Sequence, residues 1–307
     1  MSTYYQPSHK MPLGGVLLTL LGGLVAAAVL AVVYIYAVWY IPIVYANFLL
    51  CAGFGLGLGL VLALLGRRGK LRSPRGMAAL AVVVGLVALY LQWGVWLMLL
   101  FNSETTGTGA DADTTTAFSL PLLLDILSQP GAMWAAMLDV NKTGTWSLKG
   151  STPSGLFLGL IWVVEALIIL VATYLVATSR ADEPFSELAD EWADEETLAH
   201  PIGYAHDAAA TRTALEAGRF DEALTPHREA TDLGQFAHLK LHCSPNDPTC
   251  AYLSYENVTK SLDKKGKPEQ KTEAVVQYLA VSPAVVQALK ARFGTAPGVG
   301  PQPTGIA

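Results

Sequence analysis

The feature that most limits how this chain can fold is a run of 56 residues, Met11–Gly66, that contains no Asp, Glu, Lys or Arg. A second uncharged run covers Met77–Ser103, and the segment Ser151–Thr178 carries a single charge, Glu165. Only 15% of the whole chain is charged, against about 25% in soluble domains. Apolar runs of this length are typical of membrane spans. The composition therefore excludes both an ordinary soluble enzyme and a disordered chain.

The first run is too long for one crossing, because a helix rises about 1.5 Å per residue and the hydrocarbon core is about 30 Å thick. Pro42 lacks an N–H and disfavours helix at Ile41, so the chain is expected to turn there. We therefore predict an α-helical membrane protein with four transmembrane helices. Their expected positions are Gly14–Val38, Pro42–Leu65, Met77–Leu100 and Gly155–Thr178.

The charges of the connecting loops predict the orientation. The loop Gly66–Gly76 carries five Lys or Arg residues and no acid, which favours the cytoplasmic side. Four crossings then leave both termini in the cytoplasm and the connection 102–154 outside. Tyr and Trp residues gather at the predicted outer ends of the spans, where amphipathic rings favour the headgroup layer. Spans rich in Ala, Gly and Val with short loops suggest a bacterial inner-membrane protein, with residues 1–178 as its membrane domain.

The outer connection contains two apolar segments that are too short to span. The first is Leu120–Leu127. The second begins near Pro130, with Ser128 as a candidate cap and the proline in the first helical turn. We expect two short helices that either lie on the outer membrane surface or cover the bundle. The preceding stretch Ser103–Thr116 is rich in Thr, Gly and Asp and is expected to be mobile.

Residues 179–294 are predicted to form a small cytoplasmic α+β domain. Phe185, Leu188 and Trp192 recur at helical spacing within an acidic run and predict an amphipathic helix. The strict alternation in Phe236–Cys243 predicts a strand. One face carries Phe236, His238, Lys240 and His242, and the other carries Ala237, Leu239, Leu241 and Cys243. Further strands near Cys250–Val258 and Thr272–Val281 complete an antiparallel β-meander.

Helices are expected on either side of this meander. Asp207 can cap a helix that Gly218 ends, and Ser282 with Pro283 can start another. The Gly/Pro-rich segment 295–307 is expected to be disordered. From Ser179 onward the chain holds 19 acids and 12 Lys or Arg residues, and this acidic balance argues against binding to nucleic acid.

Glu165 is the strongest candidate for a functional residue. Inserting an ionised carboxylate at the centre of a span costs about 2.5–3.5 kcal/mol on insertion scales, so acidic residues at this depth usually mark functional sites. No Lys or Arg occurs within any predicted span, so we expect a protonated carboxyl group. Tyr90 and Gln92 lie at a similar depth and could form hydrogen bonds with it. Three interpretations stay open: an interhelical hydrogen bond, a proton or cation site, and a contact between copies of the chain.

Glycines in the second span form two overlapping pairs at a spacing of four residues, Gly53 with Gly57 and Gly55 with Gly59. Missing side chains let helix backbones approach closely in a membrane. We expect these glycines to pack helices within the bundle, with a dimer seam as the alternative.

Cys243 and Cys250 stand six residues apart on either side of a predicted turn. A structural zinc site needs four ligands, and only two thiols are available here. We therefore expect no cofactor and two ordinary buried residues, with zinc as the alternative.

No nucleophile elbow, P-loop, zincin motif or dinucleotide fingerprint occurs in the sequence, which favours a role other than catalysis. Our first hypothesis is a membrane-anchored adaptor or scaffold whose cytoplasmic domain binds a protein partner. The alternative is a subunit of an oligomeric channel or proton-coupled transporter that uses Glu165. In both cases the lipid bilayer is a partner, and a homo-oligomer is compatible with either.

Overall fold

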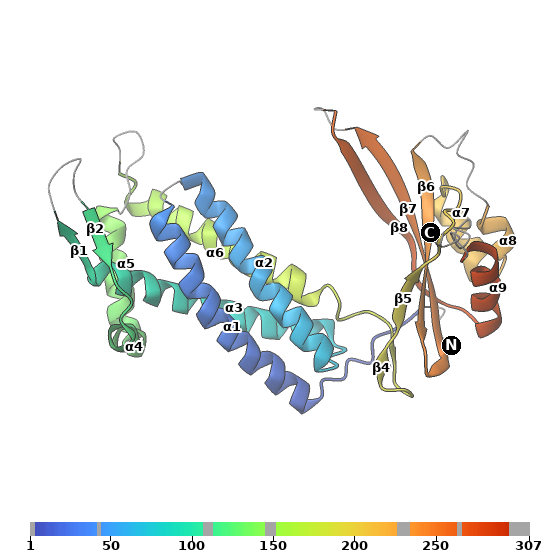
Figure 1. Cartoon of the computed structure of the whole chain (residues 1–307), viewed down its shortest axis with the longest axis horizontal. Coiled ribbons are helices and arrows are strands. Elements are labelled where there is room, and N and C mark those ends of the chain that lie inside the picture. Colours follow the sequence, from blue (N-terminus) through green and yellow to red (C-terminus); the bar gives the residue numbers. More distant parts are fainter. Residues whose placement is uncertain are drawn as a thin grey trace, which may run out of the picture. The chain divides into compact units, whose positions relative to one another are not determined.

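The computed structural model describes residues 4–41, 44–106, 113–144, 152–225, 234–262 and 266–294 (Figure 1). The chain divides into two compact units. The helical unit is His9–Asp182, and the tail unit combines Met1–Ser8 with Glu183–Ala307. Segment 295–307, which the sequence predicts to be disordered, lies outside the described residues.

In the described part of the chain, four helices are long and apolar enough to cross a membrane. By length and composition they indicate a multi-pass membrane protein, and they agree with the four predicted spans to within a few residues at each end. Their bounds are α1 Leu13–Tyr40, α2 Val44–Arg68, α3 Pro74–Phe101 and α6 Gly155–Thr178. The predicted turn residue Pro42 lies outside the described residues.

The four long helices form a ring in which α1 and α6 each pack against both α2 and α3. The interior is filled by small and aliphatic side chains such as Ala31, Leu58 and Val84, all of which are inaccessible to solvent. Helix α3 begins where Ser73 accepts a hydrogen bond from the Gly76 amide, followed by Pro74 in the first turn. This is the usual start of a helix, because such a cap satisfies an otherwise unpaired N–H group.

Two short helices follow α3, as the sequence predicts: α4 Leu120–Ser128 and α5 Pro130–Thr143. The expected cap is wrong, because Ser128 is the last residue of α4 and Gln129 occupies the N-cap position of α5. The stretch that we expected to be mobile contributes two paired antiparallel strands, β1 Ser103–Thr106 and β2 Asp113–Thr116.

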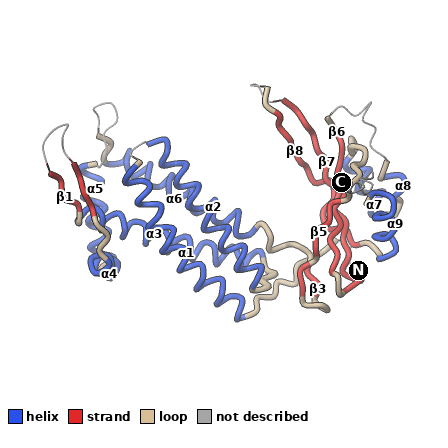
Figure 2. Tube along the Cα trace, in the orientation of Figure 1, coloured by secondary structure: helices blue, strands red, loops and turns tan. Residues whose placement is uncertain are grey.

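The tail unit is built on an antiparallel sheet in the order β5-β6-β7-β8, drawn in red in Figure 2. The strand bounds are β5 Asp194–Thr197, β6 Gln235–Ser244, β7 Asp247–Leu262 and β8 Pro268–Ala280. The predicted meander is therefore present, with longer strands and one additional edge strand, β5. Three helices contribute to the core on one face of the sheet: α7 Ala208–Glu216, α8 Phe220–Ala223 and α9 Pro283–Phe293.

The helix caps of the tail unit are as predicted. Asp207 accepts a hydrogen bond from the Ala210 amide, and Ser282 accepts one from the Val285 amide. Gly218 adopts a φ of +75° just after α7, a backbone conformation that favours glycine. These local signals position α7 and α9 against the sheet.

The predicted acidic amphipathic helix is wrong. That segment forms two short paired strands, β3 Phe185–Ser186 and β4 Glu191–Trp192, before β5 begins. Asp190 takes a φ of +55° at the turn between them, and the Phe185 and Trp192 rings meet edge-to-face with centroids 5.1 Å apart. Leu188, the third residue of the expected apolar stripe, is 81% exposed. The spacing of the apolar residues therefore reflects the pairing of Phe185 with Trp192 across a turn, and not one face of a helix.

The N-terminal segment belongs to the tail unit, whereas the sequence analysis assigned it to the membrane domain. The Tyr5 amide donates a hydrogen bond to the Tyr278 carbonyl (2.9 Å), and Tyr4 forms a bridge with Leu279 of β8. The Tyr5 ring packs edge-to-face on the rings of Tyr252 and Tyr278. Backbone pairing and ring contacts together tie this segment to the edge of the sheet.

Candidate functional site

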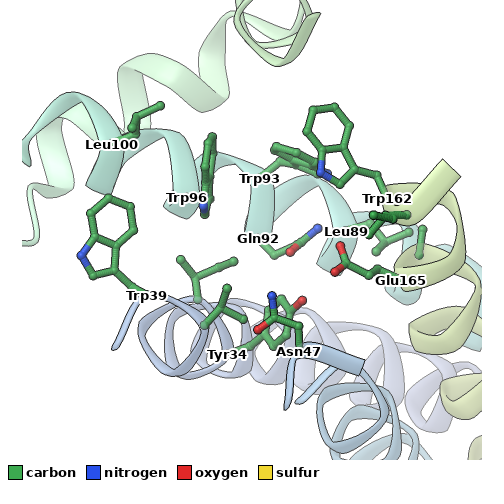
Figure 3. A pocket seen from close by; sticks show the side chains of 14 residues that line it. Tyr34, Trp39, Asn47, Leu89, Gln92, Trp93, Trp96, Leu100, Trp162 and Glu165 are labelled. Atoms are coloured by element: carbon green, nitrogen blue, oxygen red, sulfur yellow. The ribbon is translucent and has the colours of Figure 1, made fainter. Parts of the chain in front are cut away.

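A cavity of about 370 Å³ lies among the four long helices, in the half of the bundle where α1 ends and α6 begins. Figure 3 shows its side chains from close by. Every long helix contributes to it: Tyr34, Ile35, Val38 and Trp39 from α1, Asn47 from α2, Leu89, Gln92, Trp93, Trp96 and Leu100 from α3, and Ile161, Trp162, Glu165 and Ala166 from α6.

Of the described residues that line this cavity, Glu165 is the one with a carboxyl group. It lies ten residues after the start of α6, about 15 Å along the helix axis, and its side chain is partly buried. Within the described residues it forms no hydrogen bond and no ion pair. Among the described residues that line the cavity there is no Lys, Arg or His, so none of these lining side chains neutralises a carboxylate.

Gln92 reaches the same cavity, and Figure 3 shows its amide and the Glu165 carboxyl group pointing toward each other. Tyr90 does not line the cavity: its hydroxyl donates a hydrogen bond to the Leu127 carbonyl of α4 (2.7 Å). The structure thus brings together Glu165 and Gln92, while Tyr90 holds α4 against the bundle.

Four tryptophans line the cavity, and the sequence analysis did not assign them to a site. The Trp93 ring meets Trp162 edge-to-face with centroids 4.7 Å apart, and it meets Trp96 in the same way at 5.6 Å. Trp39 lies on α1. The sequence predicts instead that the aromatic residues of α1 and α3 lie in the headgroup layer. Positions 89, 92, 93, 96 and 100 of α3 share one helical face, and that spacing could have indicated a common lining.

Two more polar groups face the cavity. The Tyr34 hydroxyl lies 3.1 Å from the Cys51 sulfur, and its ring stacks on Phe54. The amide oxygen of Asn47 is buried and has no hydrogen-bond partner among the described residues. A buried acceptor without a donor is costly, so this oxygen is free to accept a hydrogen bond from a bound molecule.

The glycines of α2 divide into two pairs with different surroundings. A Cβ atom on Gly55 would lie 2.6 Å from the Ile169 carbonyl oxygen, and one on Gly59 would lie 2.8 Å from that of Thr173, so both face α6. The Thr173 hydroxyl also donates a hydrogen bond to the Gly55 carbonyl (3.2 Å). A Cβ on Gly53 would meet nothing within 4 Å, and one on Gly57 would touch only a Leu30 methyl group at 3.7 Å. Gly55 and Gly59 therefore set the close approach of α2 to α6.

The two tail cysteines are free thiols on neighbouring strands. Burial raises the pKa of Cys243, and it raises that of Cys250 to about 11. Among the described residues, no three His, Cys, Asp or Glu side chains lie together as a metal site would require. The expectation of no cofactor, and its alternative of zinc at Cys243 and Cys250, both stay untested.

A Ser–His–Glu arrangement lies on the sheet. The His242 Nε2 atom is 3.2 Å from the Ser254 hydroxyl, and Nδ1 is 4.0 Å from the Glu195 carboxylate. A hydrolase would need an accessible hydroxyl, but Ser254 is only 2% exposed and its oxygen also accepts a hydrogen bond from the Tyr278 amide. This group therefore joins strands and is not a candidate nucleophile.

The cavity around Glu165 is thus the strongest candidate site in the described chain. It combines one unpaired carboxyl group, two amides and several aromatic rings in a helical bundle. No protein-family model matches the chain, and no curated protein or solved structure is significantly similar to it.

Proposed function

We propose that this chain is a multi-pass protein of a bacterial inner membrane, with both termini in the cytoplasm. The five basic residues of loop 66–76 support the orientation, because short basic loops stay inside. A chain segment that packs into a folded unit lies on the same side of a membrane as that unit. The pairing of Tyr4 and Tyr5 with β8 supports two termini on one side, which requires an even number of crossings.

We propose that the helical bundle is a subunit of an oligomeric channel or proton-coupled transporter, with Glu165 as the group that binds and releases the transported or coupling ion. The observation that carries this proposal is the position of Glu165 in a cavity without a basic side chain. Acidic residues within membrane spans mark proton relays and ion pathways. A carboxyl group with no internal counterion can exchange a proton for a cation, which is the chemistry that coupled transport needs.

A flux measurement tests this role. The full chain is reconstituted into lipid vesicles that contain a pH-sensitive dye, and proton flux is compared between the wild type and Glu165→Gln. Glutamine keeps the shape and the hydrogen-bonding groups but cannot ionise, so we expect flux to fall to that of empty vesicles. Glu104→Gln, which removes an exposed acid of β1, is the matched control and should leave flux unchanged. Wild-type flux in a correctly assembled Glu165→Gln protein would contradict the proposal.

A second function, an adaptor role for the tail unit, is favoured by β8. This strand lies at the edge of the sheet, and its first seven residues, Pro268–Ala274, are all exposed. An exposed strand edge can pair with an extended segment of a partner protein. A photo-crosslinker at Lys271 should then capture one defined protein in cells, whereas a crosslinker at Glu222 on α8 should not. Equal, diffuse crosslinking from both positions would argue against an adaptor.

A further inference from the structure

We propose that the cavity binds a hydrophobic organic cation carrying one positive charge, such as a quaternary ammonium ion or a protonated amine. This inference names the ligand class of the proposed transport site and rests on that function. It follows from three properties of the cavity, namely its charge, its aromatic lining and the small number of its oxygen ligands.

The charge of the lining calls for a cation. Within the part of the lining that the structure describes, Glu165 is the one acid and has no basic partner. A buried charge is tolerated only when it is paired. A cationic ligand beside Glu165 would supply that partner, and an anionic ligand would add a second unpaired negative charge.

The aromatic rings favour an organic cation over an inorganic one. Trp162 and Trp93 lie on the side of the cavity next to Glu165, and Trp96 extends this group of rings away from it. The face of an indole attracts a cation within about 6 Å and is the usual recognition element for quaternary ammonium groups. A metal cation such as Mg²⁺ or Ca²⁺ instead requires six or more oxygen ligands, and the lining offers only a few carboxyl, amide and hydroxyl oxygens.

Size and hydrogen bonding are consistent with this ligand class. A volume of about 370 Å³ lies within the range of small-molecule sites. The unpaired amide oxygen of Asn47 can accept a hydrogen bond from a protonated amine. The ligand would thus meet one charge, one acceptor and a mainly apolar wall.

Proton and organic cation compete for the same carboxyl group in this scheme. When the protonated carboxyl binds a cation, the Glu165 O–H bond breaks, one proton leaves to solvent, and the carboxylate pairs with the ligand. The titratable groups that face Glu165 from other helices are Tyr34 of α1 and Cys51 of α2, and α3 contributes only the neutral Gln92. A phenol and a thiol are ordinarily neutral at pH 7, and an amide does not titrate, so affinity for the cation should rise with pH through ionisation of Glu165.

A pair of probes with the same shape and opposite charge tests the proposal. The full chain in a nonionic detergent is titrated with tetraphenylphosphonium, a cation, and separately with tetraphenylborate, its anionic counterpart. Tryptophan fluorescence reports binding. We expect saturable quenching by the cation only, weakened roughly 10- to 100-fold by Glu165→Gln and roughly 3- to 30-fold by Trp162→Leu. Trp134→Leu, at an exposed residue of α5, is the matched control and should bind as the wild type does.

The outcomes separate this inference from the proposed function. Equal binding of both probes, or unchanged cation binding by a folded Glu165→Gln protein, overturns the organic-cation site. If Glu165-dependent proton flux persists while the cation does not bind, the ligand class is wrong and the transport role stands. If the cation binds through Glu165 but vesicles show no flux, the ligand site is supported and the transport role fails.

Discussion

At the scale of single residues, the Asn257 side chain forms with the Ala205 backbone the two hydrogen bonds that a neighbouring strand would otherwise form. Its amide group donates to the Ala205 carbonyl and accepts from the Ala205 amide, both at 3.0 Å. Asn257 is buried, so Asn257→Ala leaves two backbone groups of the loop before α7 without partners. We expect this substitution to destabilise the tail unit by roughly 2–3 kcal/mol.

Hydrogen exchange on the full chain measures this effect as faster exchange of the β7 amides. Gln270→Ala, at an exposed position of β8, serves as the control and should leave exchange as it is. If Asn257→Ala leaves the protection of β7 unaltered, the paired amide contributes nothing to the stability of the unit.

His242 makes the tail unit sensitive to acid. Burial lowers the pKa of His242 below its usual value, and the neighbouring carboxylate of Glu195 only partly opposes this effect. Burial also lowers the pKa of His238. Between these lowered values and the unfolded value of about 6.5, the unfolded chain binds more protons than the folded one. The free energy of unfolding therefore decreases as the pH falls below about 6.5.

Thermal unfolding of the full chain between pH 7.5 and pH 5 checks this prediction, with exchange of the β6 amides as the local signal. His242→Gln removes one of the two titrating groups and should make the pH dependence shallower. A wild-type protein whose β6 exchange shows no loss of protection down to pH 5 would contradict it.

At the scale of elements, the two glycine pairs of α2 offer a matched test of helix packing. A methyl group at Gly55 would meet the Ile169 backbone, which cannot move without shifting α6, whereas a methyl group at Gly53 meets open space. Gly55→Ala should therefore lower the unfolding temperature of the bundle in detergent. Gly53→Ala should leave it unchanged or raise it, because alanine is favoured over glycine in a helix by up to about 1 kcal/mol.

The pair Gly53 and Gly57 also distinguishes packing within the chain from a contact between two copies of the chain. If Gly53 and Gly57 lay at a contact between copies, Gly53→Ile would dissociate an oligomer while the bundle stayed folded. We expect the oligomeric state, measured by light scattering in detergent, to be insensitive to this change. Dissociation by Gly53→Ile would restore the dimer hypothesis.

The elements that the sequence predicted correctly carry their signals locally. The long uncharged runs predict the four long helices, and the strict alternation of residues predicts β6. The capping residues Asp207 and Ser282 predict where α7 and α9 begin. The acidic helix was wrong because Phe185 and Trp192 pair across a turn, and the helical period cannot distinguish such a pair from a helix face. Strand β5 was missed because its partner β6 lies about 40 residues further along the chain.

The candidate site was partly predictable, because the sequence gives the depth of a residue along a helix but not the direction in which its side chain points. Glu165 stands out because a charge within a span is rare, and depth along the helices suggested Gln92, which lines the same cavity. The same depth argument suggested Tyr90, whose direction depends on helix rotation and leads it to α4 instead. Trp93 and Trp162 were not predicted as neighbours, since composition does not tell an aromatic ring in the headgroup layer from one that faces the bundle interior.

At the scale of the whole molecule, the N-terminal segment constrains how the chain can cross a membrane. Tyr5 contributes a backbone hydrogen bond and two ring contacts to the sheet of the tail unit. Because residues near the N-terminus pair with the sheet of the C-terminal tail unit, we expect both ends of the chain to lie on the same side of the membrane. If α1, α2, α3 and α6 are the crossings, we expect the segment with α4 and α5 to lie on the opposite side from the tail unit.

Cysteine labelling in intact cells tests this arrangement. Asp139→Cys introduces an exposed thiol on α5, and Gln270→Cys introduces one on β8. Because Cys51, Cys243 and Cys250 are buried or half-buried, the unsubstituted chain gives the background signal. A membrane-impermeant thiol reagent should label position 139 in intact cells and position 270 only after lysis. Labelling of both positions in intact cells, or of position 270 alone, would rule out four crossings with a cytoplasmic tail.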